Sequence, residues 1–279
     1  MKGTKRTKRG RNKNHSYNFT IGCVLTLVMA ILILIGFFWT PYDPETMQGS
    51  LKLGAPSLQH WFGCDQFGRD VLSRVLSGAG STLLIGVGTI LIGGTCGVLI
   101  GAVTGYFGGW LDEGLMRIND ALAAFPSVLL ALVIIAIAGS GTYRVMLALG
   151  VAFIPSFARV VRGEFLRCRE MDYVISAKLI GVSAPRILFV HILPNILPTL
   201  LSSLAIGFNN AVLAETGLSY LGIGVQPPDA SLGRMLSESQ TYLASGSWCA
   251  IFPGLFLVLL VLGVGMLGEG ILDRFGGGR

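Results

Sequence analysis

The residues of this 279-residue chain that could carry chemistry do not form a catalytic group. A phosphate-binding loop needs a lysine, and the nearest match, which begins at Gly139, has none. The zinc motif HExxH and the nucleophile motif GxSxG do not occur in the sequence. His15, His60 and His191 are too scattered to suggest a metal site. We therefore predict that the chain is not an enzyme and has no catalytic residue, metal site or cofactor of its own.

One acidic residue, Glu215, lies deep inside an apolar run. A carboxylate in a membrane segment is costly and marks a functional site by default. Two roles stay open for Glu215: lining the path of a transported molecule, or pairing with a partner at a subunit interface, which we favour. Asn209 and Asn210 precede it and can hydrogen-bond across helices, with structural packing as the default role.

The elements that must position these side chains are apolar helices. The chain is 52% hydrophobic and 13% charged, with a mean hydropathy of +0.68, whereas soluble domains carry about 25% charged residues. A spanning helix needs about 20 apolar residues. Six runs approach or exceed this length, namely 19–39, 82–106, 121–138, 145–161, 196–216 and 250–267. The sequence therefore predicts an all-α integral membrane protein with about six transmembrane helices.

Small and rigid residues mark the second and third runs. Gly93, Gly97, Gly101 and Gly105 recur at every fourth position and form one smooth ridge along a helix. We expect static packing within this chain, and the alternative is a surface on which another helix moves. Pro126 lies inside the third run and predicts a kink. Such kinks can line a path, although most of them only bend a helix.

The net charge of +6 follows membrane topology, so no nucleic-acid partner is expected. If the N-terminus is cytoplasmic, 16 of the 21 basic residues lie on the cytoplasmic side. Seven of them fall in a basic tail, residues 1–18, which we expect to be disordered and to lie near anionic lipid. The second tail, residues 271–279, is expected on the same side. Both termini are therefore predicted to be cytoplasmic.

A polar segment, residues 172–195, predicts a short helix, a tight turn and a second helix. Asp172 can cap the first helix, and Gly181 can end it in the left-handed conformation. Ser183 can cap the second helix, which Pro194 then stops. A helix of about two turns is marginal in water on its own. The first helix therefore needs a surface to dock against.

Residues 40–81 are expected to form an outer loop that carries an interfacial helix over residues 70–77. The apolar side chains of that helix would face the membrane, whereas Arg69 and Arg74 would face water or lipid phosphate. The helix either only leads into the next span or docks directly onto a partner.

The five cysteines do not share a metal-type spacing. Cys23 and Cys96 lie in apolar runs and are expected to pack as small hydrophobic residues. Cys64 and Cys249 would both face outward. Whether these two are bridged stays open.

Segment 172–195 also resembles the cytoplasmic loop of ATP-binding-cassette (ABC) importer permeases. That loop reads Glu-Ala-Ala, three residues, Gly, nine residues, Ile, one residue, Leu-Pro. The residues that match in register are Ala177, Gly181, Leu193 and Pro194. The departures are Ile175 for Glu, Ser176 for Ala and His191 for Ile. The helix–Gly–helix shape does not depend on the three departures.

Four further windows are similar to the dipeptide, oligopeptide and nickel permeases of that family. Residues 60–86 resemble HWLGTDxxGRDVLSRxxxGxRxSLxxG, with Cys64 for Thr and Gly80 for Arg. Residues beginning at Arg117 resemble RxxDxxxAFPxLLLAL. The remaining two windows begin at residues 209 and 248 and resemble AxLAExxLSFLGLGVQPPxPSWGxML and the FPGLxxxLxVLxxNLLGDGLRDxLDP ending.

The resemblance implies the type I ABC-importer permease fold in a bacterial inner or plasma membrane, with this chain as the second permease of a pair. A first transmembrane helix, 19–39, would precede a five-helix transport core, 82–270, with a cytoplasmic coupling loop at 162–195. The implied partners are a homologous permease chain in a heterodimer, two ATPase subunits, an extracytoplasmic substrate-binding protein and membrane lipid. ATP and Mg would be bound by the ATPases.

The resemblance also implies which residues act. In the family the short helix fits a cleft of the ATPase. The implied ATPase-coupling residues are Tyr173, Val174, Ile175, Ser176, Ala177, Lys178, Gly181 and Pro194. The interface or path candidates are Glu215, Pro126, Asn209, Asn210, Gly97 and Gly101.

The expected function is half of a translocation path for peptides delivered by the binding protein. The same machine importing nickel or another metal chelate is the alternative cargo. An ion-coupled secondary transporter is the alternative of a different class, but it would favour an inverted repeat or several buried acids, and the sequence has neither.

Overall fold

The computed structural model describes the backbone of residues 5–275 and the side chains of residues 19–274. The long helices are α1 (Lys5–Phe38), α2 (Val71–Phe107), α5 (Thr142–Arg169), α8 (Leu193–Tyr220) and α10 (Trp248–Phe275). The shorter helices are α3 (Gly109–Ala123), α4 (Ser127–Ala138), α6 (Asp172–Leu179), α7 (Ala184–Arg186) and α9 (Leu232–Ser239). There are also 3-10 turns at Gly49–Leu51 and Gln240–Tyr242 and a π-helical turn at Ile187–Ile192.

Within the described residues, five helices are long and apolar enough to cross a membrane. The bent pair formed by α3 and α4 passes the same test as a sixth span. The predicted all-α integral membrane fold with about six transmembrane helices is therefore confirmed.

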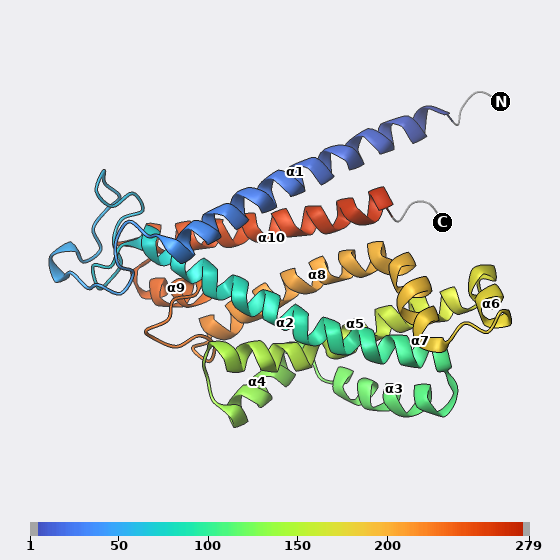
Figure 1. Ribbon diagram of the computed structural model, residues 1–279. Coiled ribbons are helices and arrows are strands. Elements are labelled where there is room, and N and C mark those ends of the chain that lie inside the picture. The colour runs from blue at the N-terminus through green and yellow to red at the C-terminus, as the bar shows by residue number, and fades with distance from the viewer. Residues whose placement is uncertain (1–4, 276–279) are drawn as a thin grey trace.

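The long helices run side by side, with the connecting segments gathered at two ends (Figure 1). Helix α2 packs along α5, α1 packs along α10, and α8 contacts α2, α5 and α10. Helices α6 and α7 lie at one end, which we call the α6 end. Helix α9 and the segment between α1 and α2 lie at the other, the α9 end.

Helix α2 begins at Val71, so the predicted interfacial helix over residues 70–77 is wrong. Asp70 caps α2 by accepting a hydrogen bond from the backbone N–H of Ser73 at 2.8 Å. Residues 71–77 are therefore the first turns of the span itself. Val71 is fully buried against α9 and α10, and Arg74 is buried too, rather than facing water or lipid phosphate. Apolar contacts across the bundle hold these turns inside it.

The ends of other predicted segments also differ. Helix α5 runs to Arg169 and the helical path into α8 begins at Ala184, so the predicted coupling loop 162–195 contains the end of α5, all of α6 and the start of that path. The backbone of α1 is helical from Lys5, within the tail expected to be disordered. Residues 1–4 and 276–279 of the predicted tails lie outside the described part.

The glycine ridge of α2 faces α5 of the same chain. A methyl group on Gly97 would lie 2.5 Å from Phe157 Cβ, and one on Gly101 would lie 2.6 Å from the carbonyl oxygen of Ala158. Real side chains cannot approach so closely, so the missing side chains are what let the two helices touch. In this structure the ridge serves packing within the chain.

The third span is broken next to Pro126. The axes of α3 and α4 differ by 84°, and the break covers the residues between Ala123 and Ser127. Proline disfavours helical geometry in the residue before it, which explains why α3 ends here. The predicted kink is present, and it is a complete break of the helix. Pro126 itself is exposed.

Candidate functional site

The backbone around α6 forms a complete helix-ending motif. Gly181 has a φ of +80°. Its N–H donates to the carbonyl of Lys178 at 3.1 Å, and the N–H of Val182 donates to the carbonyl of Ala177 at 3.0 Å. This pair of bonds defines a Schellman motif, which satisfies carbonyls that the helix leaves free. The predicted left-handed end of α6 is therefore confirmed at Gly181.

The start of α6 differs from the prediction by one residue. Met171 is the N-cap, with extended backbone angles, and Asp172 is the first helical residue without a side-chain capping bond. The carbonyl of Met171 accepts from the N–H groups of Val174 and Ile175 at 2.9 and 3.1 Å. The carboxylate of Asp172 lies in the first turn, where the helix dipole favours negative charge.

Pro194 does not stop the second helix as predicted. Helix α7 continues through the π-helical turn into α8, and Pro194 lies in the first turn of α8. The N–H of Leu193 donates to the carbonyl of Leu188, five residues back. Proline is tolerated in a first helical turn, and the wide π turn before it replaces the regular bonding pattern. The result is one apolar helical path from Ala184 to Tyr220.

Helix α6 has one buried and one exposed face. Val174 and Ala177 are buried in a cluster that we call the coupling cluster. Its other members are Ala102 of α2, Val161, Phe165 and Cys168 of α5, Ile187, Leu188 and Ile192 of the π-helical turn, and Ile196 and Leu200 of α8. Two turns of helix are thus fixed to three long helices at once.

The exposed part of α6 carries apolar side chains beside the polar Asp172, Ser176 and Lys178. Leu179 and Ile180 are 82% and 80% exposed, and Tyr173 and Ile175 are also exposed. Exposed hydrophobic side chains that adjoin one another mark interaction surfaces. Leu179 and Ile180 were not among the residues singled out in the sequence. The sequence signal that could have identified them is a pair of aliphatic residues directly before a helix-ending glycine in a polar segment.

Two polar contacts hold the rest of α6 in place. The Nζ of Lys178 lies 4.9 Å from the centroid of the Tyr106 ring, a cation–π contact with the end of α2. The side-chain amide of Asn195 donates to the Tyr173 hydroxyl at 2.9 Å. Ser176 is exposed and lies on the same side as the exposed apolar residues. The predicted coupling residues therefore divide into anchors, such as Val174 and Ala177, and exposed residues that a partner can reach.

Glu215 lies inside the chain rather than at a surface. Its side chain is fully buried in α8. One carboxyl oxygen accepts from the Ser219 hydroxyl at 2.7 Å and the other from the Thr82 hydroxyl at 3.2 Å. Thr82 Oγ1 in turn accepts from the N–H of Leu232 at 3.3 Å. The carboxyl group thus joins α2, α8 and α9 within this chain, and the predicted role of Glu215 at an interface or path stays a prediction.

The two asparagines lie on different faces of α8. Asn209 is half-buried beside α10, where a methyl group on Gly265 would lie 2.9 Å from its Nδ2 atom. Asn210 is exposed on the outer surface of α8, in line with Ile206 and Leu213. Asn209 is therefore placed for packing, and Asn210 stays available to a partner chain or a path.

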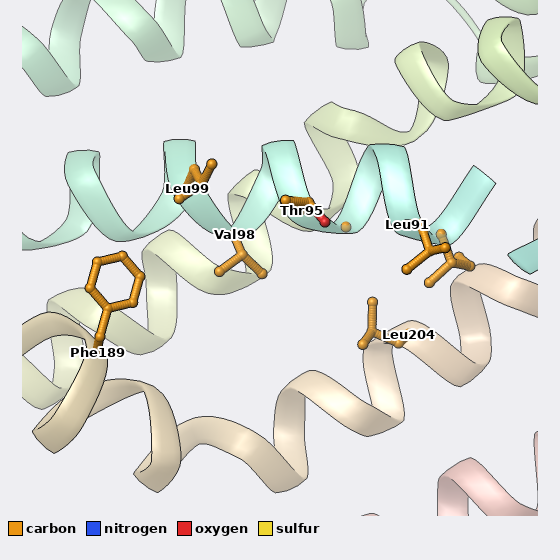
Figure 2. A pocket seen from close by; sticks show the side chains of 8 residues that line it. Leu91, Thr95, Val98, Leu99, Phe189 and Leu204 are labelled. Atoms are coloured by element: carbon orange, nitrogen blue, oxygen red, sulfur yellow. The ribbon is translucent and has the colours of Figure 1, made fainter. Parts of the chain in front are cut away.

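A groove of about 330 Å³ lies between α2 and the stretch from the π-helical turn into α8 (Figure 2). Its lining residues are Ile90, Leu91, Gly94, Thr95, Val98, Leu99, Phe189 and Leu204. Figure 2 shows Phe189 and Leu204 across the groove from the side chains of α2. Apart from the Thr95 hydroxyl, the lining side chains are hydrocarbon, so the groove holds no charged group that could fix a polar ligand.

A buried ionic network ties the α9 end together, and it was not foreseen from the sequence. Asp65 accepts from Arg69 Nε at 2.6 Å and lies 3.3 Å from Arg74 Nη1. Glu238 of α9 meets Arg69 and Arg74, each at 3.1 Å, and Arg234 at 3.0 Å. Two carboxylates thus lie among three guanidinium groups. Glu238 is far from Arg69 and Arg74 in the sequence, which is why its ion pairs with them were missed.

The fold defines a class of protein: a multi-pass membrane protein with a short anchored helix, α6, exposed at one end. Comparison with known proteins gives the family. Residues 97–276 match the model of the family "Binding-protein-dependent transport system inner membrane component", and the chain belongs to this family.

Curated relatives are similar over most of the chain. A dipeptide transport system permease protein of Alkalihalophilus pseudofirmus is 35% identical over 253 residues, which cover 91% of this chain and 83% of the relative. Glutathione transport system permease proteins of Escherichia coli and Shigella boydii are 40% identical over 251 residues, covering 88% of this chain and 83% of each relative. The chain is thus a permease subunit of an ABC importer and not the catalytic subunit, and the ion-coupled alternative loses its support.

Proposed function

We propose that this permease subunit forms half of the translocation path for peptides that an extracytoplasmic binding protein delivers. The relatives support peptide cargo, because their names specify dipeptide and glutathione transport and glutathione is itself a short peptide. The uncharged groove between α2 and α8 is consistent with cargo selection by the binding protein rather than by a fixed charge here. A metal chelate remains the alternative cargo.

The exposed apolar side chains of α6 carry the proposal for energy coupling. Leu179 and Ile180 would dock into one of two ATPase subunits, which bind ATP and Mg in place of this chain. Ser176, Ile175 and Tyr173 would line the rim of that contact. A second, homologous permease chain would present a similar helix to the other ATPase, which makes the pair of permeases a heterodimer.

The coupling cluster gives this docking a mechanical consequence. Val174 and Ala177 fix α6 to α2, α5 and α8, so a displacement of α6 moves these helices as packed bodies. When the two ATPases bind ATP and close, they would bring the two coupling helices together and open the path to the outside. ATP hydrolysis would return the path to its inward-open state. The ATPase can drive this change only by binding α6 differently in its two states.

The proposed orientation places the α6 end in the cytoplasm of a bacterium and the α9 end outside. The basic side chains of Arg159, Arg162, Arg167 and Arg169 near the end of α5 support this assignment. Both termini would then be cytoplasmic, and the binding protein would meet the α9 end.

Cargo can be tested by uptake. Deleting the gene for this chain should abolish uptake of labelled di- or tripeptides that the cognate binding protein retains, and leave nickel accumulation unchanged. The energy for uptake comes from the assembled importer, so loss of one permease chain removes transport altogether. Normal peptide uptake with impaired nickel uptake would contradict the peptide assignment and favour the metal chelate.

Docking can be tested with a photo-crosslinking amino acid in living cells. At Ile180 or Leu179 it should capture the ATPase subunit, because both side chains are exposed at the α6 end. Two control positions are Leu58, which is 97% exposed at the α9 end, and Val174, which is buried. Failure to capture the ATPase from Ile180 and Leu179 in cells that import normally would refute the docking face.

A further inference from the structure

Two cysteines that are far apart in the sequence meet at the α9 end. The Cys249 thiol, at the start of α10, donates to the carbonyl oxygen of Cys64 at 3.6 Å. The indole N–H of Trp248 donates to the same carbonyl oxygen at 3.1 Å. These contacts hold the start of α10 against the segment that precedes α2. Both cysteines are free thiols in this structure.

Both thiols are buried, and a glycine lies close to each of them. Cys64 is 1% exposed and Cys249 is 5% exposed. A methyl group on Gly54 would lie 3.9 Å from the Cys64 sulfur, and one on Gly246 would lie 3.7 Å from the Cys249 sulfur. Because the Cys249 sulfur already lies 3.6 Å from the Cys64 carbonyl oxygen, a bridge requires only that the two cysteine side chains rotate toward each other.

The remaining cysteines are placed differently. Cys23 and Cys96 lie within the spans α1 and α2, and Cys168 is buried near the α6 end. In the proposed orientation, Cys64 precedes α2 and Cys249 lies in the first turn of the span α10, so this pair adjoins the oxidising extracytoplasmic compartment, where disulfides form and persist.

We propose that Cys64 and Cys249 form a disulfide that fastens the segment preceding α2 to the start of α10. This proposal rests on the proposed orientation of the α9 end. The oxidant is the disulfide of an extracytoplasmic thiol–disulfide oxidoreductase. Its disulfide accepts two electrons and two protons from the two thiols, so one S–S bond forms in this chain as one breaks in the oxidant.

The bridge forms before the α9 end closes. Burial, with Asp70 and Asp65 nearby, raises the pKa of the Cys64 thiol to about 11. Since the thiolate is the form that reacts, thiol–disulfide exchange at Cys64 is slow in the folded protein at neutral pH. A bridge made during folding is retained for the same reason. The bridge stabilises the α9 end because it keeps the two segments joined in the unfolded chain, which lowers the conformational entropy of the unfolded state.

The bridge can be detected in the full chain taken from native membranes. Thiols are blocked in denaturant with one alkylating reagent, disulfides are then reduced, and the new thiols are labelled with a second. We expect the second label on Cys64 and Cys249, and the first label on Cys23, Cys96 and Cys168. Without reduction, a tryptic fragment containing Cys64 should be joined to one containing Cys249. First-reagent labelling of both Cys64 and Cys249 would overturn the proposal.

A stability measurement supplies a second, independent readout. Reductant should lower the unfolding midpoint of the purified wild-type importer by several degrees. It should leave the Cys64→Ser, Cys249→Ser double variant unchanged, whereas a Cys23→Ser variant should respond like the wild type. Equal responses of the wild type and the double variant would also contradict the bridge.

The orientation premise is tested separately with Leu58→Cys in the Cys64→Ser, Cys249→Ser background. An impermeant maleimide should label this variant in intact cells, since Leu58 is 97% exposed. Labelling together with free Cys64 and Cys249 in the wild type would reject the disulfide and leave the proposed function standing. Absence of labelling would reject the orientation, and the disulfide proposal with it.

Discussion

Gly181→Val is expected to lower import roughly tenfold or more while the chain remains inserted in the membrane. The φ of +80° at Gly181 is unfavourable for any residue with a Cβ atom, by about 1–2 kcal/mol, and more so for a branched one. Space is not the cause, because a methyl group there would meet no heavy atom within 4 Å. This free-energy cost disfavours the Schellman motif. A cost of about 1.4 kcal/mol lowers the ratio of chains with the motif to chains without it roughly tenfold. Peptide uptake and immunoblots of membranes measure the two effects.

Two variants separate backbone strain from bulk. Gly181→Asn should keep most of the import, because asparagine enters the left-handed region more readily than other residues. Gly114→Val adds the same side chain to α3, where a methyl group likewise meets no heavy atom within 4 Å and the backbone is helical. It should import normally. Full import by Gly181→Val, or equal loss in Gly181→Asn, would show that the left-handed turn is not what positions α6.

Arg74→Met should destabilise the chain by about 1–3 kcal/mol, because it removes buried charge-assisted contacts to Asp65 and Glu238, although both carboxylates keep other arginine partners. Arg74 is 3% exposed and contacts Asp65 at 3.3 Å and Glu238 at 3.1 Å. Methionine replaces most of the volume, so the loss reports the charge rather than a cavity. Thermal unfolding of the detergent-solubilised protein measures it.

The control for Arg74→Met is an ion pair in water. Arg117 lies 3.9 Å from Glu113, and both side chains are at least three-quarters exposed. Arg117→Met should therefore change stability by about 0–1 kcal/mol. If Arg74→Met and Arg117→Met had the same small effect, the buried network would not hold the α9 end together.

The parts of the structure that the sequence predicted well are those set by local chemistry. A glycine between a short polar helix and a second helix predicts its own positive φ, which is present at Gly181. Pro126 interrupts its span because proline acts on the residue next to it. Regular spacing of Gly97 and Gly101 predicts a smooth ridge, and packing within the chain was the favoured role.

The parts that were missed depend on partners that are remote in sequence. Arg74 is buried rather than exposed because Asp65 and Glu238 surround it, and the sequence around Arg74 does not contain Glu238. Glu215 faces inward because Thr82 and Ser219 supply hydroxyl groups, and Thr82 lies on another helix. The sequence around a charged residue in an apolar run shows that the residue needs a partner. It does not show where in the fold that partner lies.

The coupling cluster also fixes an order of assembly during synthesis. All its members lie between Ala102 and Leu200, so a growing chain holds the complete set before α9 and α10 have been made. The ionic network at the other end must wait for Glu238. Because segments fold as they emerge from the ribosome, the α6 end can complete its apolar core before the α9 end does. The last helix to be translated then closes the opposite end.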